Sequence, residues 1–501
     1  MTQDRSEQQG SLEVQEVPSE HGSLVEKNGT IGDQRDMLRM GKTQELRRNF
    51  RFVTIFGFTM VLMATWEAQL SANGFGLVNG GTAGLIWAPT TGGQYHWVSE
   101  FAPPSGQKFL SYIVGWLCVL GWQVGNTAVA FLNSQQIQGL IILNNPDYVP
   151  KRWHLTLLVI GVITFCQVFN TFLASKLPLV EGIVLILHFA GFFAILIPLW
   201  VCGERSDAKE VFTTFTDGGG WGNIGLSCLV GMLSPIFSLI GPDSATHMSE
   251  ELRDASKSLP RAMIATVLVN GAMGFVMLCT FCLMIGNNVE EILATPTKQP
   301  FIQVFYNVTQ SKAGTNAMTA ILIVLAMFGC VTNIATSSRQ IWAFARDNGL
   351  PFSKWLAHVR PGWDIPLNSV MISYAVAILL SLINIGSTVA FNIVTSLGTG
   401  ALLCSYIVSI SCVTLKRLRG EKLLPSHFSL GRFGLPINIF SILFLSLAFV
   451  MIFFPTVPHP SPAAMNWNVL VFGVVLVFSI FYFLVRGRYR YDGPVAYVKK
   501  S

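Results

Sequence analysis

An apolar stretch is interrupted by a short polar break about midway along the chain. Residues 224–240 read IGLSCLVGMLSPIFSLI, and Gly241, Pro242 and Asp243 follow at once. Glycine loosens a helix, proline lacks the backbone N–H that a helix would use, and a carboxylate comes next. Within a bilayer such an opening is costly unless it lines a cavity or binds a ligand. We therefore predict a ligand site here, where freed amides meet an anionic group and freed carbonyls meet a cation.

Asp243 leaves a second interpretation open. An aspartate before a helix often accepts hydrogen bonds from the first free backbone N–H groups, and a short helical stretch runs on here to His247 and Glu250. On that interpretation Asp243 is a structural N-cap, and the break itself carries the binding function.

The first apolar stretch is interrupted in a similar way. FRFVTIFGFTMVLM gives way to Ala64, Thr65, Trp66 and Glu67, with Gln, Ser, Asn and Gly close behind. A carboxylate inside a membrane usually faces a cavity, and Glu67 could pair there with the ammonium group of an amine or amino acid. The alternatives are that Glu67 lies near the lipid headgroups or pairs structurally with another side chain. Two interrupted helices, one early and one midway, are typical of an inverted repeat with its binding site between the halves.

Further polar residues lie inside other apolar stretches. Glu181 and His188 are seven residues apart and share one helix face, and His188 lies deep enough to be a proton-relay candidate. Asn333 stands among small polar residues in GCVTNIATSS, while Trp122 and Asn126 follow helical spacing on another stretch. Hydrogen bonds between neighbouring helices would explain the same polar residues, as would a purely structural histidine.

These observations define a predicted substrate site and exclude other chemistry. The sequence has no HExxH motif and no coordinated set of catalytic groups, so we expect neither an enzyme nor a bound metal or cofactor. The nine cysteines lie in or beside apolar stretches and are interpreted as free thiols. The predicted substrate-binding residues are Met63, Ala64, Thr65, Trp66, Glu67, Phe237, Ser238, Ile240, Gly241, Pro242, Asp243 and Asn333.

The composition places these residues in a membrane protein. Hydrophobic residues make up 51% of the 501 residues and charged residues only 12%, whereas soluble domains carry about a quarter charged residues. The net charge of +6 fits cytoplasmic lysines and arginines better than nucleic-acid binding. Residues 1–45 are polar and are expected to form a disordered cytoplasmic tail, residues 46–490 the transmembrane domain, and residues 491–501 a short cytoplasmic tail.

Apolar runs of about 20 residues predict an all-α protein with eleven membrane spans. Trp and Tyr cluster near several of their ends, as an interfacial belt requires. The polar loop 286–313 is placed outside, where the sequon at Asn307 would be glycosylated during synthesis. The predicted spans are 52–72, 109–132, 154–174, 179–201, 223–247, 261–285, 315–338, 367–385, 388–413, 435–454 and 467–485.

Positive charge tests this topology, because Lys and Arg concentrate in cytoplasmic loops. The clusters that begin at Arg253, Arg339, Lys416 and Arg486 are separated from one another by two predicted spans, so all four share one face. The N-terminal cluster at 47–51 does not fit, because five predicted spans separate it from the Arg253 loop. An additional crossing before that loop would reconcile every cluster.

Three accounts of this mismatch remain open. The first span could pass only halfway and return, the N-terminal tail could lie outside, or a segment of one span's length could be missing. The weak point lies between Trp66 and Lys108, where NGGTAGLIW runs directly into APTTGGQYHWVSEFAP. A helix that starts at Gly84 would stop after one turn at Pro89.

Several of these motifs resemble one family of transporters. SEELRDASKSLPRAMI, following IFSLIGPDSATHM, is similar to the loop after the broken sixth span of the amino acid–polyamine–organocation superfamily. TWEAQLSANGFGLVNGGTAGLIW, APTTGGQYHWVSEFAP and FLSYIVGWLCVLGWQ resemble fungal amino acid/choline permeases, and the likeness covers about residues 45–490. The resemblance implies twelve spans in a five-plus-five inverted repeat, with two extra helices. It also implies a substrate site between Met63–Glu67 and Phe237–Asp243, and uptake coupled to an ion gradient, commonly of protons.

The sequence departs from that family in two places. Relatives carry a second span between the NGG stretch and the APTxGGQYHW loop, and its absence here agrees with the charge count and favours a missing segment. Some relatives place a coupling lysine within the fifth span. Residues 179–201 contain no lysine, so His188 is the substitute candidate for proton coupling.

We therefore expect a secondary active transporter of amino acids, choline or related small amines such as 4-aminobutyrate, working by alternating access. Its expected partners are that substrate, a coupling proton and the lipid bilayer. The plasma membrane is the expected location, and the vacuolar membrane is the alternative. Two rival interpretations remain, namely a transporter-like sensor without flux and a non-functional truncated form of the gene product.

Overall fold

In a computed structural model of the protein, the described part of the chain is almost entirely helical. Among the described residues, β-type backbone pairing is limited to two isolated β-bridges. The predicted all-α membrane fold is confirmed, and all nine cysteines are free thiols, as expected. The described residues are 29–39, 42–86, 98, 101–103, 105–285, 289–360, 363–387, 389–421, 423, 430–491 and 493.

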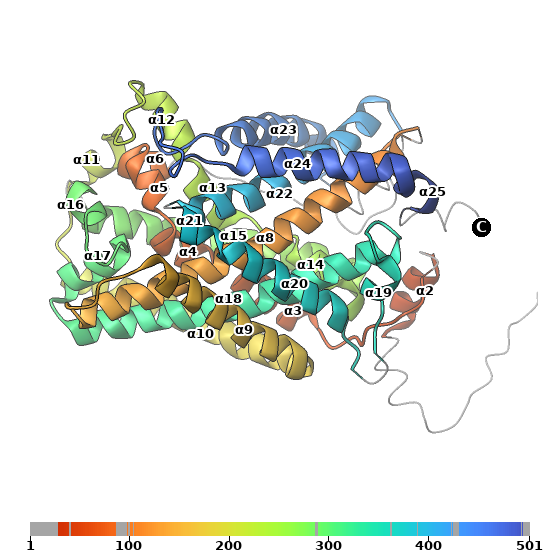
Figure 1. The fold of residues 1–501 in the computed structure, drawn as a ribbon, viewed down its shortest axis with the longest axis horizontal. Coiled ribbons are helices and arrows are strands. Elements are labelled where there is room, and N and C mark those ends of the chain that lie inside the picture. The colour runs from red at the N-terminus through yellow and green to blue at the C-terminus, as the bar shows by residue number, and fades with distance from the viewer. Residues whose placement is uncertain are drawn as a thin grey trace, which may run out of the picture.

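Ten helical segments of the described part are long and apolar enough to cross a bilayer. They coincide with ten of the eleven predicted spans, and the eleventh corresponds to the shorter pair α12 (Ile224–Gly231) and α13 (Leu233–Leu239). Figure 1 shows the long helices running along the length of the molecule. The ten segments are Phe52–Val78 (α3 to α5), Gln107–Asn144 (α8), Arg152–Phe172 (α9), Ala174–Cys202 (with α10, Leu177–Cys202), Ala255–Ile285 (α15), Lys312–Arg346 (α18), Leu367–Gly386 (α20, Leu367–Ser381, and α21, Ile383–Gly386), Ala390–Leu418 (α22), Gly431–Met451 (with α23, Gly434–Met451) and Asn468–Arg490 (with α24, Asn468–Tyr482).

Both predicted interruptions are breaks in helical geometry. The first span divides into α3 (Phe52–Met63) and α4 (Thr65–Ser71) at Ala64, whose φ of 41° lies in the left-handed region. After α13 the chain passes through Gly241, whose φ of 109° suits a residue without a side chain, and then forms α14 (Ser244–His247). Because α13 packs against α4, the two breaks lie together inside the bundle.

Part of the N-terminal tail is folded, which differs from the expected disorder up to residue 45. Residues of α2 (Ile31–Arg39) dock on the loop before α15, where Asp33 accepts hydrogen bonds from Asp254 N at 3.0 Å and Ala255 N at 3.3 Å. Asp33 also pairs with Arg48 at 3.2 Å. Burial opposes ionisation, but these backbone N–H groups and Arg48 hold the pKa of Asp33 below its usual range. The partners are distant in sequence, so the polar composition of the tail could not reveal them.

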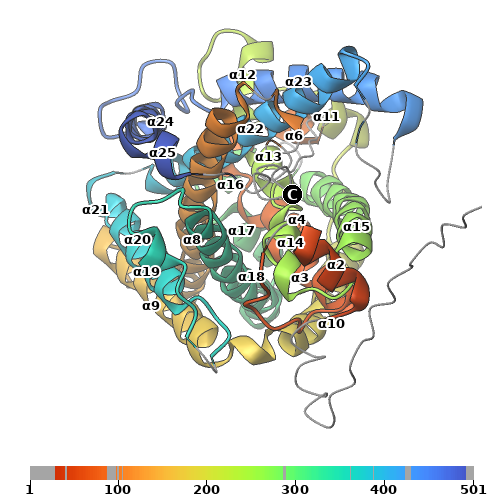
Figure 2. The ribbon, with the colours of Figure 1, turned by 90° about the vertical axis from the view of Figure 1, so that its right-hand side faces the viewer.

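The tail and the loop before α15 lie on one face of the bundle. Phe50 and Leu252 form a parallel bridge, in which Phe50 N donates to Glu251 O at 2.9 Å and Arg253 N donates to Phe50 O at 3.1 Å. We call this end the tail face. It lies on the right in Figure 1 with α2 and α25 (Arg488–Arg490), and Figure 2 views the molecule from it. The tail therefore does not lie opposite this loop, which removes one of the three accounts of the charge mismatch.

The first span reaches the opposite face in full, which removes a second account. Asn79, just after α5 (Gly74–Val78), forms a bridge with Asp217, and Trp221 Nε1 donates to Asn79 Oδ1 at 3.0 Å. Both partners lie between α11 (Ala208–Thr213) and α12, at the left end of Figure 1. The span thus does not turn back halfway.

Phe50 and Leu252 lie on the same face, although the number of described membrane crossings between them is odd. Between Phe50 and Leu252 lie the first span, α8, α9, α10 and the broken pair α12 and α13, which makes five. The described chain leaves the opposite face in α6 (Gly81–Ile86), where Thr82 donates to Val211 O. It resumes at Val98, which packs near the tail-face ends of α8 and α22. Residues 87–97 lie outside the described part.

Candidate functional site

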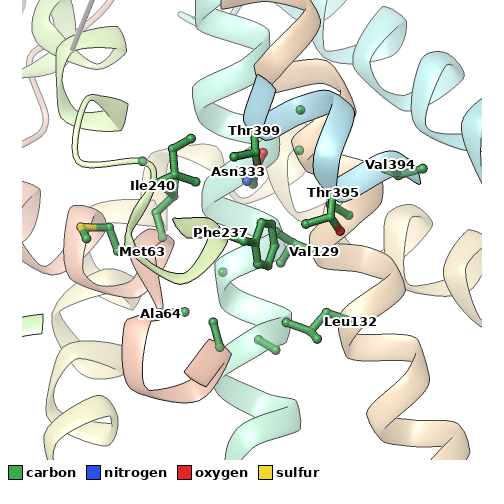
Figure 3. Close-up of a pocket in the computed structure, with 18 of the residues that line it drawn as sticks. Met63, Ala64, Val129, Leu132, Phe237, Ile240, Asn333, Val394, Thr395 and Thr399 are labelled. Carbon is green, nitrogen blue, oxygen red and sulfur yellow. The ribbon is translucent and has the colours of Figure 1, made fainter. Parts of the chain in front are cut away.

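A cavity of about 70 Å³ lies where the two broken helices meet. Its walls come from α3, α4, α8, α13, α18 and α22, so segments from most of the chain converge on it. Figure 3 shows Met63 and Ala64 from the first break, Phe237 and Ile240 from the second, and Asn333 from α18. The volume suits about five waters or a small polar molecule of similar size.

Small residues allow α8 and α22 to approach closely beside this cavity. A Cβ on Gly121 would lie 2.6 Å from Leu402 Cγ and 3.3 Å from Gly398 O, and a Cβ on Gly398 would lie 3.4 Å from Gly121 O. The backbones therefore meet almost directly, as small residues permit between membrane helices. Gly125 continues the same face of α8 and lines the cavity opposite Asn333.

Glu67 and His188 form a buried polar contact at one side of the cavity. Glu67 Oε1 lies 2.7 Å from His188 Nδ1, and both side chains are almost fully buried. His188 Nε2 lies 3.0 Å from Asn270 Oδ1 on α15, and Asn270 Nδ2 donates to Met60 O at 3.1 Å. The contact joins α4, α10 and α15, so it exists only in the assembled bundle. Of the alternatives for Glu67, a position near the lipid headgroups does not fit this burial.

These contacts fix how protons are distributed over the pair. The Met60 carbonyl can only accept, so the Asn270 amide turns its nitrogen toward Met60 and its oxygen toward His188. His188 Nε2 must therefore carry a proton. A lone pair on Nδ1 would repel a carboxylate 2.7 Å away, so one further proton is shared between Nδ1 and Glu67 Oε1. The pair holds one dissociable proton, as carboxylic acid with imidazole or as carboxylate with imidazolium.

Trp66 encloses this pair on a second side. Its ring centroid lies 5.7 Å from that of His188 and 5.8 Å from that of Phe192, and its side chain is fully buried. An apolar wall of this kind excludes water and strengthens the electrostatic interaction between Glu67 and His188. Trp66 therefore supports the site from behind and does not line the cavity.

Several polar atoms at the cavity wall have no hydrogen-bond partner among the described residues. They are Glu67 Oε2, Asn333 Oδ1, Thr399 Oγ1, Trp122 Nε1 and both polar side-chain atoms of Gln136. Buried polar groups are almost always paired, so these atoms mark where a ligand or water binds. Most of them accept hydrogen bonds, and Glu67 is the one ionisable side chain among the described residues that line the cavity. The site therefore suits a cation that carries N–H donors.

The structure brings seven of the twelve predicted substrate residues to the cavity wall. The other five lie behind it or on another face; Ser238, for example, donates to Ser234 O at 3.0 Å along its own helix. The seven are Met63, Ala64, Glu67, Phe237, Ile240, Gly241 and Asn333, and the five are Thr65, Trp66, Ser238, Pro242 and Asp243.

Asp243 occupies the N-cap position of α14, but its side chain makes no capping bond. Tyr406 on α22 donates to Asp243 Oδ1 at 2.7 Å, and His247 Nε2 lies 3.4 Å from Asp243 Oδ2. The expectation that the Asp243 carboxylate caps the half-helix is therefore wrong. The carboxylate instead ties the second break to α22, which sequence spacing could not show.

Sequence reasoning missed most of the wall supplied by α8 and α22. The cavity is lined there by Trp122, Gln136, Thr395 and Thr399, and the sequence indicated only Trp122. A four-residue spacing of threonines in α22 was the available signal, because residues i and i+4 share a helix face. Asn126 instead donates to Ser337 Oγ at 2.8 Å, which is the bond between helices that the alternative interpretation predicted.

Two further predictions concern residues away from the cavity. Asn307 is exposed in α17 (Pro300–Thr309), at the end opposite the tail face, and its side chain accepts from Gln303 Nε2 at 2.8 Å. Its glycosylation stays a prediction. No group of three or more metal-ligating side chains is found within the described ranges.

Comparison with known proteins gives one consistent result. A family model described as amino acid permease matches residues 76–477. A protein of Macrophomina phaseolina, provisionally named an amino acid/polyamine transporter, is 30% identical over 440 residues, covering 83% of this chain and 96% of its own. The choline transporter of Saccharomyces cerevisiae is 29% identical over 476 residues (88% and 82%), and amino-acid permease 2 of Neurospora crassa is 26% identical over 509 residues (96% and 92%).

Proposed function

Because this chain belongs to the amino acid permease family, we propose that it carries a small primary amine or amino acid across a membrane by secondary active transport. The family and the ten apolar helices make it a multi-pass membrane transporter. The substrate class, the coupling ion and the residues that serve them are the proposal. We place the transporter in the plasma membrane, as expected from the sequence.

The free oxygen of Glu67 is the observation that carries the proposed substrate class. Glu67 Oε1 is engaged by His188, while Oε2 is buried at the cavity wall without a partner. A substrate ammonium at Oε2 would form a charge-assisted hydrogen bond in a site closed to water. The free acceptors Asn333 Oδ1 and Thr399 Oγ1, on α18 and α22 of the same cavity, are the proposed partners of the further ammonium hydrogens.

The same acceptors argue for a primary amine over choline. A quaternary ammonium has no N–H group, so it would leave Glu67 Oε2 and Asn333 Oδ1 without hydrogen bonds at a cost of about 1–3 kcal/mol each. Quaternary ammonium sites usually rely on several aromatic faces. Trp122 and Phe237 are the aromatic side chains among the described residues that line this cavity. We therefore propose amino acids and 4-aminobutyrate as the better substrates.

The proton shared by Glu67 and His188 is the proposed coupling proton. An ammonium at Glu67 Oε2 stabilises the carboxylate form, so it drives the shared proton fully onto His188 Nδ1. The protonation of the pair and the binding of substrate are thereby linked, because each changes the free energy of the other. This linkage is what a proton-driven transporter requires.

Alternating access requires that the cavity open to one side at a time. Toward the tail face, the short η2 helix (Ser249–Glu251) follows α14, and Arg339 Nε on α18 donates to Glu251 Oε1 at 2.8 Å. Arg346 Nη1, about two turns further along α18, donates to Glu250 Oε2 at 2.7 Å. We propose that these ion pairs hold the path to the tail face closed and separate when it opens.

An uptake panel tests the proposed substrate class. Cells that lack their own permeases would express this chain and receive radiolabelled 4-aminobutyrate, common amino acids or choline, at two external pH values. Uptake of a primary amine that rises with the proton gradient supports the proposal, and uptake of choline alone would contradict it. Thermal stabilisation by an amine without any uptake would instead favour a sensor.

A further inference from the structure

We propose that Glu181 is a second proton-binding site, which loads and releases its proton at the tail face during transport. Its role in coupling rests on the proposed function, whereas the presence of its proton rests on geometry alone. The site belongs to α10, two helical turns from His188 toward the tail face, and it is separate from the substrate cavity.

Glu181 is fully buried four residues after the start of α10. Its Oε1 lies 2.7 Å from Thr332 Oγ1 on α18, and its Oε2 has no hydrogen-bond partner among the described residues. Its backbone carbonyl packs on Gly57 of α3, where an added Cβ would lie 3.0 Å away. The carboxyl group thus sits at the junction of α3, α10 and α18.

Hydrogen-bond counting places a proton on this carboxyl group. Thr332 Oγ1 lies 2.7 Å from Glu181 Oε1 and also 2.8 Å from Phe328 O. A hydroxyl has one hydrogen, and a backbone carbonyl can only accept. A single hydrogen shared between the two acceptors would make two weakened bonds, whereas both contacts are made in full when Thr332 donates to Phe328 O and Glu181 donates its own proton to Thr332 Oγ1. Glu181 is therefore a neutral carboxylic acid in this conformation.

The surrounding charges agree with a neutral acid. Within the described part, Glu181 has no ion pair, and α3 contains no ionisable side chain. On its own helix His188 is engaged by Glu67, and on α18 Arg339 is engaged by Glu251. Cys330, two residues before Thr332 on α18, is a buried free thiol and carries no charge in that form. An isolated carboxylate would be costly in this setting, so protonation is the physical solution.

The remaining helices against α10 add no cation to this site. The α15 helix meets α10 through uncharged contacts, such as the bonds of Asn270 with His188 and of Thr280 with Trp200. The α17 helix packs near the opposite face, and Lys176, just before α10, is exposed. The exposed Lys176 end lies about one turn from Glu181, so water at the tail face is the nearest proton acceptor.

The position of Glu181 relative to His188 suggests its role. Seven residues of helix place the two sites about 10 Å apart along α10. Thr332, which binds Glu181, directly precedes Asn333 at the cavity wall. The proposed step breaks the Glu181 O–H bond, passes the proton to water at the tail face, and leaves a carboxylate that then accepts the Thr332 hydrogen. Movement of α18 during alternating access would thus change the proton affinity of Glu181.

Reconstituted full-length protein tests the coupling role. Glu181→Gln keeps the shape and a hydrogen-bond donor but cannot release a proton. We expect it to exchange labelled for unlabelled 4-aminobutyrate within twofold of the unchanged protein, while accumulation driven by a pH gradient falls at least tenfold. Thr332→Val should reduce gradient-driven accumulation as well. Two matched controls, Thr336→Val in the buried part of the same helix and Glu291→Gln on the exposed surface, should leave both readouts unchanged.

Equal losses of exchange and accumulation in Glu181→Gln, at normal protein amounts, would show a structural role and overturn the proposal. Normal accumulation would overturn it too. Infrared spectroscopy tests the proton without any transport, because the absorption of a protonated carboxyl group should be lost in Glu181→Gln and kept in Glu291→Gln. Loss of that absorption together with no uptake of any amine by the unchanged chain would refute the proposed function but leave the proton site standing. No loss of that absorption would refute the proton site itself.

Discussion

His188 Nδ1 lies 2.7 Å from Glu67 Oε1, although 121 residues separate the two side chains. The sequence identified each residue separately, Glu67 as an ammonium partner and His188 as a proton carrier. Their contact links ligand binding to proton binding, because a ligand that binds the free oxygen of Glu67 changes where the shared proton resides.

We expect Glu67→Gln to weaken uptake far more than it weakens expression. A charge-assisted hydrogen bond in a desolvated site contributes about 2 kcal/mol. Its loss should raise the substrate concentration for half-maximal uptake roughly 30-fold. The measurement is concentration-dependent uptake normalised to surface protein, with Glu291→Gln as the control. Unchanged uptake at a normal surface level would assign Glu67 a structural role.

His188→Gln should separate transport from the proton gradient. Glutamine can still donate to Glu67 or accept from a neighbour, but it cannot carry a second proton. We expect substrate exchange to persist and the dependence of uptake on external pH to become flat. A variant that keeps the pH dependence of the unchanged protein would show that the coupling proton binds elsewhere.

The buried ion pair between Arg339 and Glu251 should be sensitive to the loss of one partner. Arg339 is almost fully buried, so Arg339→Met leaves the Glu251 carboxylate without its partner, and we expect a loss of about 3–5 kcal/mol in unfolding free energy. The double variant Arg339→Met with Glu251→Gln should recover most of that loss, because no uncompensated charge remains. Thermal unfolding in detergent measures both. Additive losses in the double variant would mean that the two side chains do not depend on each other.

Docking of the tail should depend on the Asp33 carboxylate. Backbone N–H groups and Arg48 lower the pKa of Asp33 against the opposing effect of burial, so the folded protein favours the charged form. The stabilisation is therefore present above the ordinary value of 3.8 and is lost as pH falls through the lowered pKa. Asp33→Asn should release α2 at neutral pH, and limited proteolysis should then cut within residues 29–45. Equal protease resistance would show that apolar contacts of α2 hold the tail.

The segment before α8 leads to a prediction about the whole chain. Five described crossings join two segments on the tail face, which agrees with the charge count and with one span's length missing after α6. A cavity of about 470 Å³ lies between α4, α6, α13, α15 and α23, and Leu85 and Ile86 at the end of α6 line it. At Gly271 on α15, a Cβ would meet no atom within 4 Å. This cavity is where an additional helix would pack.

We expect the chain as written to transport poorly and a longer form to transport well. The eleven residues 87–97 span only about 17 Å as a helix, which is short of a hydrocarbon core of about 30 Å. A form with about 25 additional apolar residues after Trp87 would cross the bilayer and cover the cavity. Uptake and surface level are compared for both forms, and the other variants are measured in the form that reaches the surface. Strong transport by the short form alone would contradict this prediction.

The positions of the helices follow from the sequence for a clear physical reason. Each apolar run must satisfy its own backbone in lipid, so length and hydropathy locate the spans, and Gly241 with Pro242 marks where helical bonding cannot continue. The positions of lysine and arginine in the loops likewise indicate, from the sequence alone, that the number of spans between the N-terminal cluster and the Arg253 loop is odd. Glu67 and His188 were found because ionisable groups inside membranes are rare.

Contacts between distant helices were decided only by the tertiary structure. Sequence spacing relates residues three or four apart on one helix, and it contains no information on which faces of α4, α10, α15, α18 and α22 meet. The Glu67–His188 pair, the bond from Tyr406 to Asp243 and the proton on Glu181 all depend on such meetings. The glycines of α8 and α22 allow these two helices to approach closely. That packing decides which polar atoms around the cavity have no hydrogen-bond partner.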